Sequence, residues 1–138
     1  VGVYCFTQAV NENEAREEAQ ACVYVLNGRQ LDYPIYFDTE ASGSGSGRAD
    51  GLGVEDRTKC AVAFCEEVKA LGYQPMVYFN WHQSENLYYL SELEDFPFWL
   101  ALYQDRMRYP WKVEMWQYTC TGRVPGINGD VDINVYMP

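Results

Sequence analysis

The sequence predicts an α/β fold with a mostly parallel sheet. Strand-like and helical segments follow one another in the order β-α-β-α-β-α-β-β-β, and the strand candidates are apolar on both faces, which is typical of a sheet covered by helices. A parallel β/α barrel and a doubly wound sheet both fit this order. A barrel is favoured because it gathers reactive groups at the carboxyl ends of its strands. The polar residues expected there are Asp38, Glu40, Asn80, Gln104, Gln117 and Asp132.

The first strand and helix occupy the first 28 residues. Residues 1–7 have strand character, and Asn11 is the expected N-cap of the following helix, with Glu14 completing a capping box. Gly28 is the expected C-cap. The apolar positions recur at helical spacing and predict one buried stripe. This stripe comprises Ala15, Ala19, Cys22, Val23 and Leu26.

A second strand and helix follow a similar pattern. The strand covers residues 34–38, with Pro34 at its start, where a missing amide costs little. The helix begins at about Val54, carries acids in its first turn and stops at Gly72. Its expected buried face comprises Ala61, Phe64, Cys65, Val68 and Leu71. The small residues of 41–47 are expected to form a loop at the rim of the site rather than a linker.

The rest of the chain supplies a third strand at 74–80, a short helix at 84–94 and three more strands. These last strands are joined without helices and cover residues 98–104, 113–119 and 129–136. The chain has 138 residues, of which 48% are hydrophobic, so it can bury one sizeable core. We therefore expect a single domain over residues 1–138.

Composition excludes several classes of partner. The formal net charge of -10 argues against nucleic acid and anionic lipid, since both are bound through lysine and arginine. No apolar run approaches the roughly 20 residues of a membrane span. The cysteines are odd in number and lie in apolar runs, so we expect buried thiols rather than a disulfide framework. They are Cys5, Cys22, Cys60, Cys65 and Cys120.

Two carboxylates at the end of the second strand are the strongest chemical signal. Asp38 and Glu40 are two residues apart, so in an extended chain they project from one face, with their backbones about 7 Å apart. Paired carboxylates repel each other, which raises the pKa of one and places a protonated acid beside an ionised partner. Glycosidases use this pair. The alternative is a solvated acidic loop that caps a helix.

Aromatic residues strengthen the carbohydrate interpretation. Rings with polar groups stack on sugar faces and also bond to hydroxyls, although each one alone is more often a core residue. The aromatic residues on or near the ends of expected strands are Tyr36, Tyr78, Trp99, Tyr103, Trp116 and Tyr118. Asp132 is a third acid expected at the same rim as Asp38 and Glu40, with an isolated surface acid as the alternative.

Other chemistries lack their motifs. The run 43–47 is neither a dinucleotide-binding nor a P-loop glycine pattern. Residues 130–134 imitate the start of a calcium loop, but Val135 stands where that loop needs glycine. His82 is the only histidine, which leaves zinc and a Ser-His-Asp triad without support. We therefore expect no metal and no cofactor.

Six segments together resemble the glycoside hydrolase family 25 lysozymes, the N-acetylmuramidases of phage endolysins and bacterial autolysins. They cover essentially the whole chain in the family's order: "VGVYCFTQAV", "YPIYFDTE", "GYQPMVYFN", "FPFWLALYQ", "VEMWQYTCTG" and "GINGDVDINVY". The resemblance implies a TIM-like β/α barrel whose last strands are joined without helices. The first residues match the family's third strand, so the expected barrel is N-terminally incomplete, with six of eight strands.

The resemblance also implies an activity and a set of residues. The family hydrolyses the β-1,4 bond between N-acetylmuramic acid and N-acetylglucosamine in peptidoglycan, without a cofactor and with net retention. Glu40 matches the general acid, Asp38 the carboxylate that supports the reacting sugar, and Asp132 the acid on the final strand. The expected substrate-binding residues are Tyr78, Trp99, Trp116, Gln117, Tyr4 and Tyr36.

A second hypothesis follows from the absence of the family's first strand, which carries an aspartate facing the catalytic pair. On this hypothesis the chain is a weakly active or inactive fragment that binds glycan or self-associates through open barrel edges. The partner expected in either case is the glycan strand of peptidoglycan. The resemblance implies either a secreted autolysin at the cell wall or outside the cell, or an endolysin released from the host cytoplasm.

Overall fold

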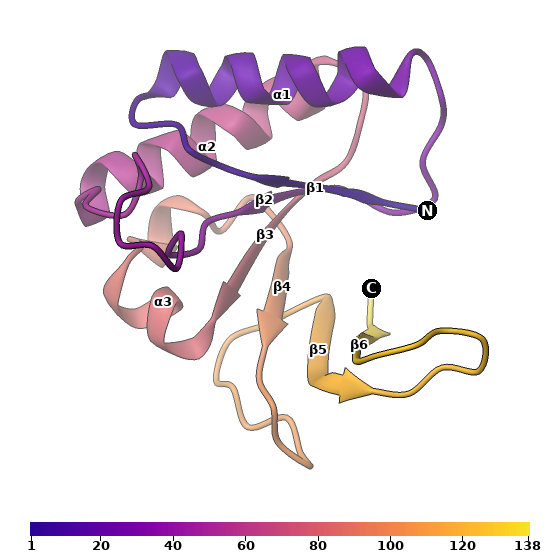
Figure 1. The fold of residues 1–138 in the computed structure, drawn as a ribbon. Coiled ribbons are helices and arrows are strands. Elements are labelled where there is room, and N and C mark those ends of the chain that lie inside the picture. Colours follow the sequence, from indigo (N-terminus) through magenta and orange to yellow (C-terminus); the bar gives the residue numbers. More distant parts are fainter.

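The computed structural model describes all residues, 1–138, as a six-stranded sheet curled into a half-barrel (Figure 1). The strands lie side by side in chain order. The first five are parallel and the sixth is antiparallel to the fifth. They are β1 (Val3–Phe6), β2 (Ile35–Asp38), β3 (Pro75–Asn80), β4 (Phe98–Ala101), β5 (Met115–Gly122) and β6 (Val131–Tyr136). The mixed α/β class and the strand order agree with the sequence prediction.

Helices connect the first four strands and cover the convex side of the sheet. The two long helices lie side by side there (Figure 1). The helices are α1 (Glu12–Leu26), α2 (Val54–Ala70) and α3 (Trp81–Asn86), followed by a 3-10 turn at Leu90–Glu92. No helix is long and apolar enough to cross a membrane.

The ends of α1 differ in detail from the prediction. Asn11 does cap the helix, since its side chain accepts a hydrogen bond from the Glu14 amide at 3.0 Å. Glu14, however, accepts from the Val10 amide at 3.1 Å rather than from Asn11, so the expected capping box does not form. The C-cap is Asn27, in the left-handed region with φ 50°, and not Gly28.

The predicted helix at 84–94 is wrong in its limits. The observed α3 starts at Trp81, because the Asn80 side chain accepts from the Gln83 amide at 2.9 Å and Gln83 returns a bond to the Asn80 amide. The capping residue Asn80 is also the last residue of β3, where the sequence pattern indicates only a strand. Beyond Asn86 the chain forms no further α-helix until β4.

The main core lies between the convex face of the sheet and the helices. Alternate residues of β2 and β3 point to the helices, and the Phe37 and Phe64 rings pack with centroids 5.3 Å apart. Leu71, expected in this core, is 38% exposed because it follows the end of α2. Cys22 and Val23 are only partly buried.

The cysteines correct another expectation. All five are free, as predicted, but only Cys60 and Cys65 are buried. Cys5 and Cys22 are half-buried between β1 and α1, and Cys120 is exposed on β5. The prediction fails at Cys120 because the end of β5 has no helix over its outer face.

Candidate active site

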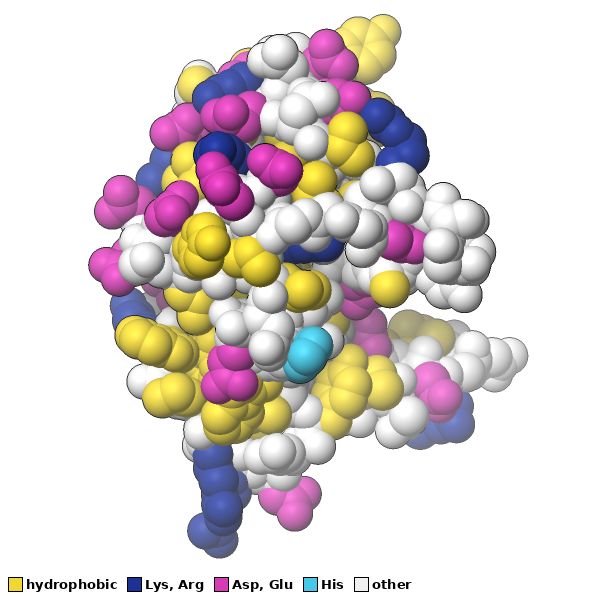
Figure 2. Space-filling model, turned by 90° about the vertical axis from the view of Figure 1, so that its left-hand side faces the viewer, with side chains coloured by type: hydrophobic (Ala, Val, Ile, Leu, Met, Phe, Trp, Pro, Cys, Tyr) yellow, Lys and Arg dark blue, Asp and Glu magenta, His cyan; other side chains and the backbone are white.

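The carboxyl ends of the parallel strands surround a small cavity of about 230 Å³. Each of the six strands, or the segment just after it, contributes to this cavity, since alternate residues of a strand share one face. Its lining comprises Tyr4, Phe6, Asp38, Glu40, Tyr78, Trp99, Gln117 and Asp132. Figure 2 looks onto this end of the sheet and shows a hollow with acidic side chains (magenta) at its inner end.

All three predicted acids therefore lie in one cavity. Asp38 is the last residue of β2, and Glu40 follows two residues later in the irregular segment beyond the strand. Asp132 also lies in this cavity, but its position within the last strand differs from the prediction. It does not end the last strand; it is the second residue of β6, and because β6 is antiparallel its beginning lies at the same rim.

Asp38 has the most perturbed environment of the three. Its side chain is buried, and Oδ1 has no hydrogen-bond partner. Burial raises the pKa of Asp38 to about 7, and the neighbouring negative charge of Glu40 contributes to the same shift. Glu40 is exposed to the cavity and to solvent. The carboxyl whose pKa rises is thus Asp38, the one to which the resemblance assigns a supporting role.

Polar groups on β3 and β5 form the wall of the cavity. The hydroxyls of Tyr78 and Tyr103 both donate to Gln117 Oε1, at 3.0 and 2.8 Å. These two bonds orient the carboxamide and leave its nitrogen without a protein acceptor. Burial raises the pKa of Tyr78, so this hydroxyl stays protonated and remains a donor. The amide nitrogen of Gln117 is therefore available for a ligand in the cavity.

Trp99 forms a rigid aromatic wall on the same concave face. Its ring packs against Tyr78 and Tyr36, with centroids 4.5 and 4.8 Å apart. Its indole nitrogen donates to Asn134 Oδ1 on β6 at 2.8 Å. Because both rings and the hydrogen bond restrain it, Trp99 presents a fixed apolar surface of the kind on which a sugar stacks.

Two predicted binding residues lie outside this cavity. Tyr36 is on the concave face but farther from the rim, where it lines a neighbouring cavity of about 350 Å³ that shares Tyr4 and Trp99 with the first. Trp116 points to the opposite side of the sheet from Gln117 and packs against the main core, and its indole nitrogen donates to the Leu102 carbonyl at 2.8 Å.

Two further polar residues that the sequence placed at the rim also lie outside the cavity lining. Asn80 is occupied as the N-cap of α3. Gln104 lines a separate groove on the outer side of β5 and β6, together with Trp116.

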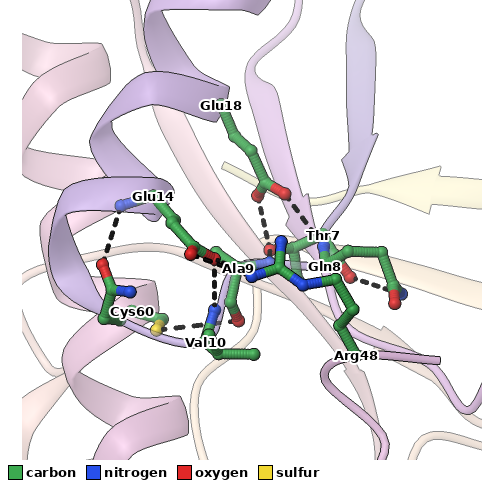
Figure 3. A network of polar contacts seen from close by, with 9 residues as sticks. Thr7, Gln8, Ala9, Val10, Glu14, Glu18, Arg48 and Cys60 are labelled. Atoms are coloured by element: carbon green, nitrogen blue, oxygen red, sulfur yellow. Dashed lines mark hydrogen bonds and ion pairs between the residues drawn. The ribbon is translucent and has the colours of Figure 1, made fainter.

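Acidic residues of α1 hold the segment that follows β1 (Figure 3). Glu18 accepts from the Thr7 hydroxyl and, at 2.9 Å, from the Gln8 amide. The Thr7 amide in turn donates to the Asp38 carbonyl at 2.9 Å. Glu18 therefore anchors the backbone beside Asp38. This role of Glu18 cannot be predicted from the sequence, because nothing local in the pattern of α1 distinguishes Glu18 from the other acids on the helix.

The Gly/Ser run is an ordered loop built around one carboxylate. Asp50 accepts from the Ser42 amide at 3.0 Å, the Ser42 hydroxyl at 2.7 Å and the Gly47 amide at 3.0 Å. These bonds hold the pKa of Asp50 below its usual range. Arg48 ties the loop to Glu14 of α1 at 2.9 Å (Figure 3). An aspartate after such a run is a local sequence signal for a side-chain-stabilised turn.

The structure contains no group of three or more His, Cys, Asp or Glu side chains that could hold a metal ion. The cavity contains a pair of carboxylates with a third acid, an oriented amide and aromatic walls at the carboxyl ends of parallel strands. Paired carboxylates are also the groups that glycoside hydrolases use.

The family follows from comparison with known proteins. The sequence pattern of the family described as "Glycosyl hydrolases family 25" matches residues 1–127, and the chain belongs to this family. The "Uncharacterized protein YegX" of Escherichia coli (strain K12) is 28% identical over 131 residues. That match covers 88% of this chain and 43% of the relative.

Solved structures give the same result. The crystal structure of the CTP1L endolysin has a TM-score of 0.78 with 25% identity, over 99% of this chain and 46% of that one. The modular autolysin LytC of Streptococcus pneumoniae, in complex with a synthetic peptidoglycan ligand, has a TM-score of 0.83 with 26% identity. This match covers 96% of the chain and 33% of LytC. The chain thus spans less than half the length of these relatives.

Proposed function

We propose that this chain carries the catalytic carboxylates of a lysozyme that hydrolyses the β-1,4 bond between N-acetylmuramic acid and N-acetylglucosamine in peptidoglycan. The observation that carries the proposal is the cavity in which Asp38, Glu40 and Asp132 meet beside Trp99 and Tyr78. Membership in glycosyl hydrolase family 25 supports it, as does the similarity to an endolysin and an autolysin.

Each carboxylate has a distinct task in the proposed reaction. Glu40 protonates the glycosidic oxygen as the bond to the anomeric carbon breaks, and positive charge develops on the sugar. Asp38 in its ionised form stabilises that charge, either directly or by polarising the N-acetyl group of the substrate as it attacks. Water then attacks the anomeric carbon and gives its proton to the Glu40 carboxylate, which restores the acid and completes hydrolysis with net retention. Asp132 adds a negative charge on the opposite side of the cavity.

The half-barrel supplies the geometry for this chemistry. We propose that the six strands are part of a TIM-like β/α barrel, in which the site lies at the carboxyl ends of the strands. The parallel pairing from β1 to β5 and the helices outside the sheet support the assignment. The domain assignment follows, with residues 1–138 forming one catalytic unit.

The proposed partner is the glycan strand of peptidoglycan. The protein would act on it at the cell wall, or after its own release from a host cell. The LytC structure in complex with a synthetic peptidoglycan ligand supports this choice of partner. The net charge of -10 gives no long-range attraction to an anionic wall, so the affinity of these 138 residues for the wall would come from short-range contacts with the sugar.

A second candidate function is glycan binding or self-association without cleavage. It is favoured by the unpaired outer edge of β1 and by two exposed aromatic residues on its concave face, Tyr4 at 66% and Phe6 at 41%. Light scattering after size exclusion, combined with a lysis assay, separates the two functions. A lytic monomer supports the lysozyme, and an inactive oligomer supports the second candidate.

Substitution of the proposed acid tests the proposal. Glu40→Gln keeps the shape of the side chain but cannot donate its proton, so it should abolish the loss of turbidity of purified cell walls while leaving wall binding intact. Glu17→Gln is the matched control, because Glu17 is exposed on α1 away from the cavity. Undiminished lysis by Glu40→Gln would exclude Glu40 as the acid.

A further inference from the structure

The hydrogen-bond ladder between β2 and β3 is interrupted beside the two carboxylates. The Ile35 amide donates to the Gln74 carbonyl at 2.8 Å, and Ile35 is paired with Pro75 in the parallel register. In a parallel ladder the bonds repeat every two residues. Continued past Asp38, this ladder would have the Asn80 amide donate to the Thr39 carbonyl.

In the structure a side chain takes the place of that bond. Gln83 Oε1 accepts from the Asn80 amide at 2.8 Å, and Gln83 Nε2 donates to the Thr39 carbonyl at 2.8 Å. One carboxamide thus stands between the two backbones and satisfies both groups. Gln83 and Thr39 are 8% and 4% exposed, so water does not compete effectively for these bonds.

The bonded carbonyl belongs to the residue between the two proposed catalytic carboxylates. The Thr39 carbonyl and the Glu40 amide share one planar peptide group, so fixing the carbonyl fixes the plane from which Glu40 departs. The Glu40 side chain itself makes no hydrogen bond, and it follows the last paired residue of β2. On the other side, the Thr7 amide holds the Asp38 carbonyl. Thr7, just after β1, and Gln83, in α3 just after β3, therefore hold the segment from its two sides.

We propose that Gln83 is the positioning residue of the general acid, because its carboxamide replaces the ladder bond after Asp38 and sets the direction of Glu40. The inference rests on the proposed function, since it assigns a purpose to the geometry of Glu40. Gln83 does not reach the cavity and acts only through the Thr39 backbone. If Gln83 had only a structural role, it would do no more than form the capping box of α3.

Two variants separate these roles. Gln83→Met preserves the length of the side chain but removes both hydrogen bonds. Gln83→Glu preserves the acceptor for the Asn80 amide and, when ionised, replaces the donor to Thr39 with a repelling oxygen. Asn86→Ala is the matched control, because it removes bonds to His82 at the other end of α3 without touching the rim.

With soluble peptidoglycan oligomers as substrate, Gln83→Met should lose about 10-fold to 100-fold in kcat, with KM changed by less than about twofold. Gln83→Glu should lose as much where its carboxyl is ionised and recover where the carboxyl is protonated, because the protonated form again donates to the Thr39 carbonyl. Asn86→Ala should keep the wild-type kcat. If Gln83 only caps the helix, Gln83→Glu will match the wild type in both forms, because the capping acceptor remains. A wild-type kcat in Gln83→Met, or in the ionised form of Gln83→Glu, would overturn the proposal.

A second measurement does not require catalysis. Carbon-13 NMR titration of the Asp38 carboxyl follows its interaction with Glu40, which contributes to the raised pKa of Asp38. In Gln83→Met the titration midpoint should move down toward the ordinary value, because Glu40 is released and solvent enters. An inactive wild type would contradict only the proposed function, because the NMR titration does not depend on activity. An unchanged titration midpoint of Asp38 in Gln83→Met would overturn the positioning role of Gln83.

Discussion

Asp38 is buried and lies beside the negative charge of Glu40, and the raised pKa that results affects both the stability and the proposed catalysis of the protein. In the unfolded chain its carboxyl ionises near 3.8, whereas in the folded protein the pKa is about 7. Between these two values the folded state binds more protons, so the free energy of unfolding falls as the pH rises. Asp38 therefore destabilises the folded protein above neutral pH, which is typical of a functional residue.

Replacement of Asp38 should consequently stabilise the protein while removing activity. We expect Asp38→Asn to raise the free energy of unfolding by about 2 kcal/mol at pH 8, a value reduced for screening by solvent, and by much less at pH 4. Urea denaturation at both pH values measures the difference. Asp105→Asn, at an exposed aspartate outside the cavity, is the control. Equal stability of Asp38→Asn and the wild type at pH 8 would contradict the burial of an ionising group.

The same pKa predicts the pH dependence of catalysis. In the proposed reaction Glu40 carries a proton while Asp38 is ionised, so the pair works with a single proton on its two carboxyls. That proton is lost as the pH increases through about 7, so kcat/KM should fall over this range. Initial rates on soluble peptidoglycan oligomers over this range test the prediction. The Glu17→Gln control should show the same fall. A rate that rises steadily through neutral pH would contradict the need for a proton on the pair.

At the level of single residues, the sequence identifies acids better than aromatic wall residues. Asp38 and Glu40 are only two residues apart in the chain, so a strand of any curvature brings them to one rim. Trp99 and Trp116 look alike in the sequence, but they lie on opposite faces of neighbouring strands. The face of each depends on the register between β4 and β5, which is a nonlocal property.

Among the elements, the loop at 41–47 shows how a run of small residues can be held in a fixed conformation by one side chain. Asp50 holds the Ser42 and Gly47 amides. We expect Asp50→Ala to accelerate hydrogen exchange at these two amides by about threefold to tenfold, because Ser42 loses its acceptor and Gly47 keeps only the Ser42 hydroxyl, which Asp50 no longer holds. The exchange of amides in α2 should not change. Unaltered exchange at Ser42 and Gly47 would mean that the loop is held by other contacts.

The helical pattern of the sequence identifies only some of the residues that pack α2 against the sheet. Phe64 is fully buried against Phe37, so Phe64→Ala should destabilise the protein by about 3 to 5 kcal/mol. Leu71 was expected on the same face, yet it is 38% exposed, and Leu71→Ala should cost far less. Denaturant unfolding of both variants checks the pair. Similar losses from the two substitutions would contradict the observed end of α2.

Elements with local signals are the ones that the sequence predicts well. The N-cap at Asn11 marks the start of α1, whereas the cap of α3 at Asn80 is hidden because that residue also ends β3. Asp132 reaches the rim through the antiparallel β6, and no local pattern shows the direction in which a strand pairs.

For the whole molecule, strand and helix order follows from hydrophobic periodicity, and the covering of one sheet face by helices follows from that order. The curvature and closure of the sheet cannot be predicted from hydrophobic periodicity, because they depend on the twist and pairing of all the strands together. The structure accordingly shows a curled half-barrel with unpaired outer edges at β1 and β6.

These edges permit a prediction about assembly. If the second candidate function holds, the edge of β1 pairs with another copy, and light scattering should give a mass that rises above 15.9 kDa with concentration. If the lysozyme function holds for the chain, a monomer of 15.9 kDa should carry the lytic activity. A stable, inactive dimer would favour the second candidate.

The central claim is that the carboxylate pair at the end of β2 cleaves the muramic acid bond. Mass spectrometry of fragments released from purified peptidoglycan tests it directly, because cleavage at this bond leaves N-acetylmuramic acid at the reducing end. The wild-type chain should release such fragments, and the Glu40→Gln variant should release none. Fragments that end in N-acetylglucosamine, equal release by the variant, or no release by the wild type would contradict the claim.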